Sequence, residues 1–377
     1  MWSTKRSAAP ANIRRLCTLG LPMEAIAPAL IRKLCREAHC DAGVFLWFDD
    51  RGEIADLYAR QLPAPAATVD WFRPQQDVGT AVRPPPTGPV PARRGPWLET
   101  CAVDDGDGRG RPAALTEPFC PHRHLCSMAT PSAVPLQRLC CAVVRNGVPI
   151  ASLMLYRPAS AGPFGAAERA AVKAAGRYLS LNGHALPADT SAAMYHASGE
   201  QGFLLCEPDG RVIRASANGY GLLAQASGCA VNRRTVPDEL EHAGRWLIRR
   251  LLAGDALHDA GDATARRPTT LINAWGLFRL RAFFEPDGPQ GVLIERVEHL
   301  LVRLVAAMWH LDLSVQQGEA LLLLAQGLSH EQIAERMGVS PNTADYHIRQ
   351  LYAKLSAHTR NEAIASALGT LETARAA

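Results

Sequence analysis

A series of helix caps near the C-terminus constrains the fold more than any other feature of this sequence. Gly327 and Gly338 stand where helix ends need a positive φ, and Ser340 precedes Pro341, which suits the first helical position. Other Ser or Thr residues have Gln or Glu three positions later, the spacing of a capping box: Ser314 with Gln317, Ser329 with Gln332, and Thr359 with Glu362. The caps predict four helices, at 315–326, 330–337, 341–355 and 360–368.

The second and third of these helices are separated only by residues 338–340, which is the spacing of a helix-turn-helix. In that motif the later helix enters the major groove of DNA, while neighbouring helix starts point backbone N–H groups at phosphates. The predicted outward face of the third helix carries Asp345, Tyr346 and Arg349. Arginine can read guanine and aspartate can accept from cytosine, so the pattern predicts a helix that reads DNA.

Residues 313–368 resemble the LuxR-type DNA-binding domain of bacterial transcription regulators. The resemblance runs through LSVQQGEALLLLAQGLSHEQIAERMGVSPNTADYHIRQLYAKL and continues in the R-x-E-A pattern of Arg360, Glu362 and Ala363. It implies a domain at 313–370 that binds double-stranded DNA as a dimer, with the fourth helix as the usual dimer contact. The DNA contacts that we expect are Ser329, Ser340, Asn342, Thr343, Asp345, Tyr346, His347, Arg349 and Lys354.

Departures from the family pattern weaken the expected attraction to DNA. Gly318 interrupts a predicted helix, where glycine costs about 1 kcal/mol relative to alanine, and Asp345 stands where the family commonly carries lysine. Residues 313–368 contain four Lys or Arg and five Asp or Glu, a net charge of −1, so one domain gains little from neutralising phosphates. Binding therefore needs a dimer, base contacts or basic residues elsewhere. The alternative is a signalling adaptor whose helical unit binds protein.

The segment 23–186 resembles a GAF domain, a sensory module built on an antiparallel sheet. The resemblance rests on the run AGVFLWF, the hairpin NGVPIASLMLYRP and the following helix PFGAAERAAVKAA. Asn-Gly is a strong signal for a two-residue hairpin turn, and it predicts strands at 138–145 and 148–157. Residues 61–137 match nothing clearly and are predicted to be rich in loops.

Residues 195–297 resemble a PAS domain. The segment GFLLCEPDGRVIRAS places a Pro-Asp-Gly turn between two apolar runs, and LFRLRAFF and VLIERV provide later strands. Both folds are antiparallel sheets with helices on one side, and both commonly form a ligand pocket or a dimer face. The expected signal is an unidentified small-molecule effector. A single α+β domain used only for dimerisation fits the same pattern.

The segment 298–312 is a predicted connector helix between these modules and the C-terminal unit. EHLLVRLVAAMWH places apolar residues at helical spacing and leaves almost no flexible linker. We therefore expect a change in the sensory region to rotate this helix and alter the spacing of two recognition helices. The predicted fold class is multidomain α+β, with antiparallel-sheet modules before an all-α domain and with 1–22 as an N-terminal extension.

Four candidate metal ligands stand at alternate positions of one segment: Cys120, His122, His124 and Cys126. This spacing differs from the CxxC and HxxxH separations of common zinc sites, so a loop without metal is the prediction. The phosphate-binding, nucleophile-elbow and zinc-protease motifs of common enzymes do not occur in the sequence. Neither catalysis nor a cofactor is therefore expected.

Composition agrees with a multidomain regulator. The 377 residues predict two or three domains at about 150 residues each, and an apolar content of 47% is sufficient for their cores. No apolar run approaches the ~18 residues of a membrane-spanning helix, and ten cysteines in a chain of this length do not indicate a disulfide scaffold. We therefore expect a cytoplasmic protein without a membrane partner, for which RNA polymerase is a further candidate partner.

Overall fold

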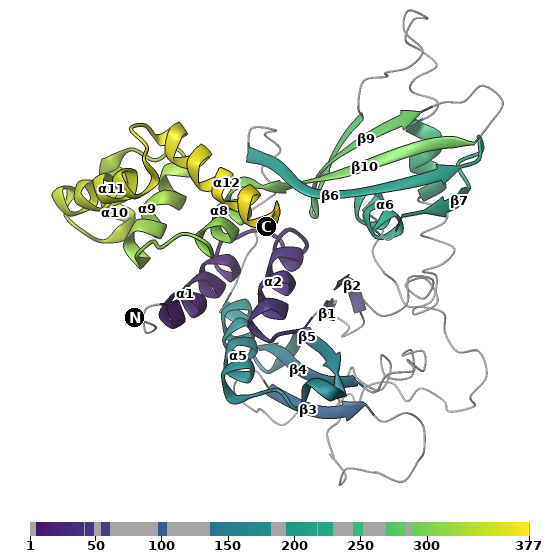
Figure 1. Ribbon diagram of the computed structural model, residues 1–377, viewed down its shortest axis with the longest axis horizontal. Coiled ribbons are helices and arrows are strands. Elements are labelled where there is room, and N and C mark those ends of the chain that lie inside the picture. Colours follow the sequence, from purple (N-terminus) through teal and green to yellow (C-terminus); the bar gives the residue numbers. More distant parts are fainter. Residues whose placement is uncertain are drawn as a thin grey trace, which may run out of the picture.

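The computed structural model describes residues 5–40, 42–48, 54–60, 97–103, 136–181, 194–216, 218–228, 244–251, 269–283 and 289–376. These residues form two antiparallel sheets and a C-terminal group of helices (Figure 1). The mixed α+β class with a helical C-terminal region is thereby confirmed. The candidate metal ligands Cys120, His122, His124 and Cys126 lie outside the described residues.

The first sheet has the strand order β2-β1-β5-β4-β3, with every neighbouring pair antiparallel. Its strands are β1 (Ala42–Phe48), β2 (Ile54–Arg60), β3 (Trp97–Val103), β4 (Leu136–Arg145) and β5 (Val148–Pro158). The predicted hairpin joins β4 to β5, and its Asn146 and Gly147 have φ of 52° and 81°, as a type I′ turn requires. β3 falls in the segment predicted to be rich in loops. Its pairing with β4 joins residues about forty positions apart, which no local pattern reveals.

Three helices accompany the first sheet: α1 (Lys5–Cys17), α2 (Met23–Glu37) and α5 (Ala166–Leu181), the last after the short 3-10 helix η1 (Ala159–Ala161). α5 packs on β3, β4 and β5, and α2 packs on β1 and β2. The predicted extension 1–22 contains α1, which contacts both α2 and α5. Ile13 and Leu16 of α1 are buried in the main core, so α1 is an integral part of the folded unit.

The second sheet has the order β7-β6-β10-β9-β8, also entirely antiparallel. Numbered from its own first strand, each sheet therefore reads 2-1-5-4-3. The strands are β6 (Tyr195–Cys206), β7 (Val212–Ala215), β8 (Thr269–Asn273), β9 (Gly276–Phe283) and β10 (Gln290–His299). α6 (Gly219–Ser227) packs on β6, β8 and β10, and a further helix at 244–251 buries Leu247, Ile248 and Leu251 in the same core.

β10 leads directly into α8 (Leu300–Met308), within the predicted connector at 298–312. The His299 ring caps this helix, because its Nδ1 accepts the N–H of Leu301 at 3.2 Å. Every residue of α8 is buried, since α1, α2, α9 and α12 surround it (Figure 1). α8 is therefore a central core helix against which the N-terminal and C-terminal helices both pack. Among the described helices, none is both long and apolar enough to cross a bilayer.

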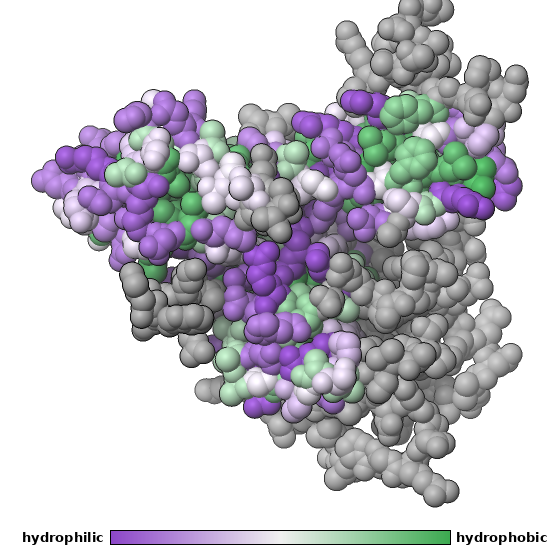
Figure 2. Space-filling view, in the orientation of Figure 1, coloured by the Kyte–Doolittle hydropathy of each residue, from purple (hydrophilic) through white to green (hydrophobic). Residues whose placement is uncertain are grey.

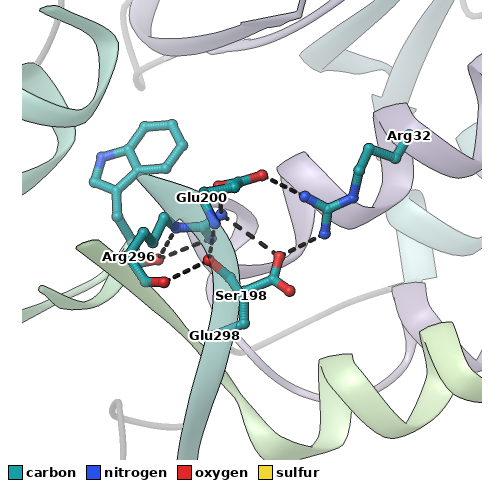
Figure 3. Close-up of polar contacts among 6 residues, drawn as sticks. Arg32, Ser198, Glu200, Arg296 and Glu298 are labelled. Atoms are coloured by element: carbon teal, nitrogen blue, oxygen red, sulfur yellow. Dashed lines mark hydrogen bonds and ion pairs between the residues drawn. The ribbon is translucent and has the colours of Figure 1, made fainter. Parts of the chain in front are cut away.

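A cluster of two arginines and two glutamates joins α2 to the second sheet (Figure 3). Arg32 pairs with Glu200 and, at 2.6 Å, with Glu298. Arg296 lies 2.9 Å from Glu200 and 3.5 Å from Glu298, and it also donates to the carbonyl of Trp275. Burial alone would lower the pKa of Arg32, but the carboxylates of Glu298 and Glu200 outweigh it and raise this pKa. The charges balance, as a buried cluster requires.

Aromatic rings extend the contact between the two sheet units. The Trp275 ring lies 5.5 Å from Trp47 and 6.4 Å from Tyr58, measured between ring centroids. Burial, together with the nearby Glu200 carboxylate, raises the pKa of Tyr58 to about 12. Glu298 is the residue before His299, the cap of α8. The cluster and the aromatic rings therefore connect the first sheet unit to the start of the core helix.

Candidate nucleic-acid interface

Four helices form the C-terminal unit: α9 (Val315–Ala325), α10 (His330–Met337), α11 (Pro341–Leu355) and α12 (Arg360–Ala376). Their predicted starts are confirmed, because complete capping boxes precede α9 at Ser314 and α10 at Ser329, and Ser340 caps α11. The glycine at the end of α10 has the predicted left-handed conformation. Two helix ends differ, since α9 ends one residue before its predicted end and α12 continues eight residues beyond its own.

The start of α12 shows a variation of the predicted capping box. Thr359 Oγ1 accepts the N–H of Glu362 at 3.2 Å, whereas the Glu362 carboxylate accepts the N–H of His358 at 2.8 Å. The backbone N–H of His358 holds the pKa of Glu362 below its ordinary value. The side chain of Arg360, at the start of the same helix, donates to the carbonyl of Ala325 at the end of α9.

A small apolar core fixes α11 on the other helices. Leu321 of α9, Ile333 of α10 and Leu351 of α11 are each fully buried. Ala334 of α10 is also buried, and α10 packs on α11. The unit therefore has the packing that a helix-turn-helix needs to present one helix rigidly.

The side of α11 that faces away from this core is the candidate recognition surface. Asn342, Tyr346 and Arg349 recur at four- and three-residue intervals, so they follow one stripe of the helix, and all three are exposed. The buried positions Ala344 and Ile348 lie on the opposite side. Hydrophilic side chains predominate over α10 and α11 in the space-filling view (Figure 2). The stripe is therefore open to a partner.

The starts of α10 and α11 lie beside this stripe and carry the expected hydroxyl caps. Ser340 Oγ accepts the N–H of Thr343 at 3.2 Å and also lies 2.8 Å from the Thr343 hydroxyl. Asp345 Oδ1 lies 2.8 Å from Nδ1 of His330, so the acid that replaces the family's lysine has a basic neighbour on the preceding helix. The sequence did not lead us to predict a role for His330, although its position as the first residue of the predicted helix was evident.

Two of the expected contact residues lie away from the stripe. Lys354 extends toward the segment before α9, where its Nζ donates to the carbonyl of Asp312 at 2.6 Å. His347 is half-buried and packs edge-on against Tyr346, with ring centroids 5.5 Å apart. The stripe thus contains three of the expected residues, with the Ser340 cap at its edge.

Comparison with known proteins agrees with this geometry. Residues 311–367 match the family described as bacterial regulatory proteins, luxR family. The C-terminal unit is a LuxR-type helix-turn-helix domain. A probable transcriptional regulatory protein, SgaR of Hyphomicrobium methylovorum, is 43% identical over 54 residues. That match covers 14% of this chain and 26% of SgaR, so this chain spans about a quarter of that relative, within the LuxR-type domain.

Two solved structures show weaker likeness over a larger part of the chain. One is the Vibrio cholerae VqmA dimer, a LuxR-type receptor, at 16% identity and a TM-score of 0.17, covering 46% of this chain and 84% of VqmA. The other is a phage VqmA–DPO complex at 18% identity and a TM-score of 0.18, covering 45% and 83%. These TM-scores are too low to support a common overall arrangement.

Proposed function

We propose that this chain is a sequence-specific transcription regulator that binds DNA as a dimer and responds to a signal received by its two sheet units. The observation that carries this proposal is the exposed stripe of α11 on a LuxR-type domain. Arg349, at the C-terminal end of that stripe, is the side chain best suited to read the edge of a guanine. Asn342 and Tyr346 extend the same surface along the groove.

Phosphate contacts in this proposal come from the helix starts. Backbone N–H groups at the first turns of α10 and α11 point outward at Ser329 and Ser340, where an anion is favoured. Thr343 adds a hydroxyl at the same edge. Asp345 should contribute less to the contacts with DNA than a free carboxylate would, because His330 neutralises its charge when the imidazole is protonated. Lys354 adds positive charge near the backbone of DNA, and His347 supports the domain by packing against Tyr346.

Dimerisation follows from the charge of the domain. Its net charge of −1 gives one copy little electrostatic affinity, and two recognition helices on adjacent half-sites double the base contacts. The proposal also includes contact with RNA polymerase, through which the bound dimer would change transcription.

The sensory part of the proposal assigns 23–186 to a GAF-like module and 195–297 to a PAS-like module. Both expectations describe antiparallel sheets with helices on one side, and the two observed sheets with their shared strand order support them. A small-molecule effector is the proposed signal. The ion pairs of Arg32 with Glu200 and Glu298 supply a route from the first module to the start of α8.

Selection of genomic DNA fragments by the full-length protein tests the proposal. We expect one palindromic site to be enriched, with Arg349→Ala losing about 1–3 kcal/mol of affinity and its preference at one base position. Arg177→Ala is a matched control, because Arg177 is an exposed arginine on α5, outside the LuxR-type domain. Equal selection by wild type and Arg349→Ala would contradict base reading by this residue.

The acidic balance of the domain favours one alternative, a signalling adaptor whose four helices bind protein. DNA affinity should fall steeply with salt if phosphates are bound and released counterions drive association. An absence of enriched DNA at low salt, both with the full chain and with cell extract added as a source of effector, would favour the adaptor.

A further inference from the structure

The side chain of Arg15 on α1 reaches the first turn of the LuxR-type domain. Its guanidinium donates to the carbonyl of Val315, the first residue of α9. The same group donates to Asn12 Oδ1 at 3.1 Å and contacts the sulfur of Met308, at the end of α8, at 3.9 Å. Burial lowers the pKa of Arg15, an effect that Glu319 opposes. One side chain thus connects α1, α8 and α9.

Gly318 leaves the space that this guanidinium occupies. A Cβ atom at position 318 would lie 2.6 Å from Nη1 of Arg15 and 2.8 Å from its Cζ, closer than real contacts allow. The glycine is one of the departures from the family pattern, and glycine disfavours the helix in which it stands. An alanine at this position requires the guanidinium to shift, and a shift away from α9 would weaken its hydrogen bond to the carbonyl of Val315.

The short segment between α8 and α9 is held from both sides. Lys33 of α2 lies over the ring of Trp309, 5.1 Å from its centroid, and Arg36 Nη1 lies 3.2 Å from Nε2 of His310. From the LuxR-type domain, Lys354 donates to the carbonyl of Asp312. α12 also packs along α8. The domain is therefore docked on the helices of the first sheet unit by side chains at successive points.

We propose that Arg15 is a positioning residue: by occupying the space left by Gly318, it fixes the orientation of the LuxR-type domain on α1 and α8. The stripe of α11 remains exposed in the docked arrangement, so the contact governs orientation rather than access. This inference rests on the proposed dimeric DNA binding. In a dimer of docked domains the separation of the two recognition helices is set, and one half-site spacing fits best.

The distinguishing experiment measures tolerance to half-site spacing. Two added base pairs turn one half-site by about 70° relative to the other, because B-DNA turns once in about 10.5 base pairs. We expect the wild-type full chain to lose at least about tenfold in affinity on this change. Arg15→Met and Gly318→Ala should lose about threefold or less, because their domains are no longer held in one orientation. An unchanged spacing penalty in both variants would overturn the proposal.

Matched controls are present in the same chain. Arg14→Met removes the adjacent, exposed arginine of α1. Gly221→Ala replaces a helical glycine of α6, outside the LuxR-type domain, at which an added Cβ meets no atom within 4 Å. Both controls should keep the wild-type spacing penalty. Relaxed spacing in either control would show that any change in these helices has the same effect, which would also overturn a specific role for Arg15.

A second measurement needs no DNA and separates failure of docking from failure of the proposed function. The rate of proteolytic cleavage within residues 309–313 reports how firmly the domain is held. In the wild-type background Gly318→Ala should raise this rate severalfold, whereas in the Arg15→Met background it should leave the rate unchanged or lower it. Equal increases in both backgrounds would overturn docking through this pair. If the wild type selects no DNA, the spacing argument fails together with the proposed function, and cleavage still decides the docking.

Discussion

Replacing Arg32 with methionine should loosen the contact between the two sheet units. Without Arg32, the Glu298 carboxylate loses its 2.6 Å ion pair, whereas Arg296 remains at the longer distance of 3.5 Å. The Glu298 side chain is 0% exposed, and leaving one member of a buried pair uncompensated costs about 3–5 kcal/mol. Arg32 is 17% exposed and Glu200 23%, so solvent reduces this loss. We expect the free energy of unfolding to fall by about 2–3 kcal/mol.

The double variant Arg32→Met/Glu298→Gln shows whether the loss arises from the uncompensated carboxylate. Glutamine keeps the shape of Glu298 without its charge, so the second change should cost about 1–2 kcal/mol less in the Arg32→Met background than in wild type. Urea unfolding followed by tryptophan fluorescence measures the four proteins of this cycle. The rings of Trp47 and Trp275 are suitable reporters, because they meet where the two sheet units touch.

A matched arginine elsewhere in the chain provides the control. Arg211 pairs with Glu207 on the surface, where the side chains are 53% and 38% exposed, and exposed pairs contribute about 0–1 kcal/mol. Arg211→Met should therefore change the free energy of unfolding by less than about 0.5 kcal/mol. Two results would refute the reasoning: an Arg32→Met loss no larger than this control, or additive losses in the double variant.

Three further outcomes are expected. Leu321→Ala should destabilise the LuxR-type domain by about 2–5 kcal/mol, because this fully buried side chain leaves a cavity; a loss below 1 kcal/mol in thermal unfolding would contradict its core role. Ser340→Ala should cost about 1 kcal/mol through loss of the α11 cap, and Ser340→Thr should recover most of it; equal melting of both variants would argue against capping. The pKa of Glu168 is lowered in the folded protein, since the N–H of Gly165 and the Arg157 guanidinium outweigh burial. Its stabilising effect is therefore complete above its unfolded pKa of about 4.3 and is lost as pH falls through the lower folded value. Urea unfolding of wild type and Glu168→Gln should converge at acidic pH, and a pH-independent difference would contradict this assignment.

The helices of the LuxR-type domain were predictable because their boundaries depend on local chemistry. A cap such as Ser314 or Ser329 bonds within one turn of its own helix, so its effect can be read from neighbouring residues. The turn at Asn146 and Gly147 was predictable for the same reason. The exposure of Tyr346 and Arg349 followed from the period of α11 once its start was known, whereas Asp345, expected beside them, is less exposed and lies against His330. Local rules did not indicate that Lys354 would turn toward Asp312.

Features that depend on distant pairing were missed. β3 obtains its hydrogen bonds from β4 across a long intervening segment, and its own sequence resembles a loop region. Arg32 is 168 positions from Glu200 and 266 positions from Glu298, and these charges meet only in the folded chain. The helical spacing of apolar residues predicted α8. Its burial on all sides could not be predicted, because it depends on α1 and α12, which cover it in the folded chain. Pairing over such distances leaves no periodic signal in the sequence.

Gly318 shows how a local anomaly can mark a distant contact without identifying the partner. Local preference alone would place almost any other residue within α9, because glycine weakens a helix. The position is nevertheless one that Arg15, some three hundred residues earlier, approaches so closely that an added Cβ would lie 2.6 Å from its Nη1. A residue that conflicts with its own helix indicates that something outside the helix requires it. If Arg15 is the reason for the glycine, Gly318→Ala should stabilise the protein once Arg15 has been removed. The unfavourable contact between the alanine methyl group and the guanidinium is then absent, while the better helix propensity of alanine remains.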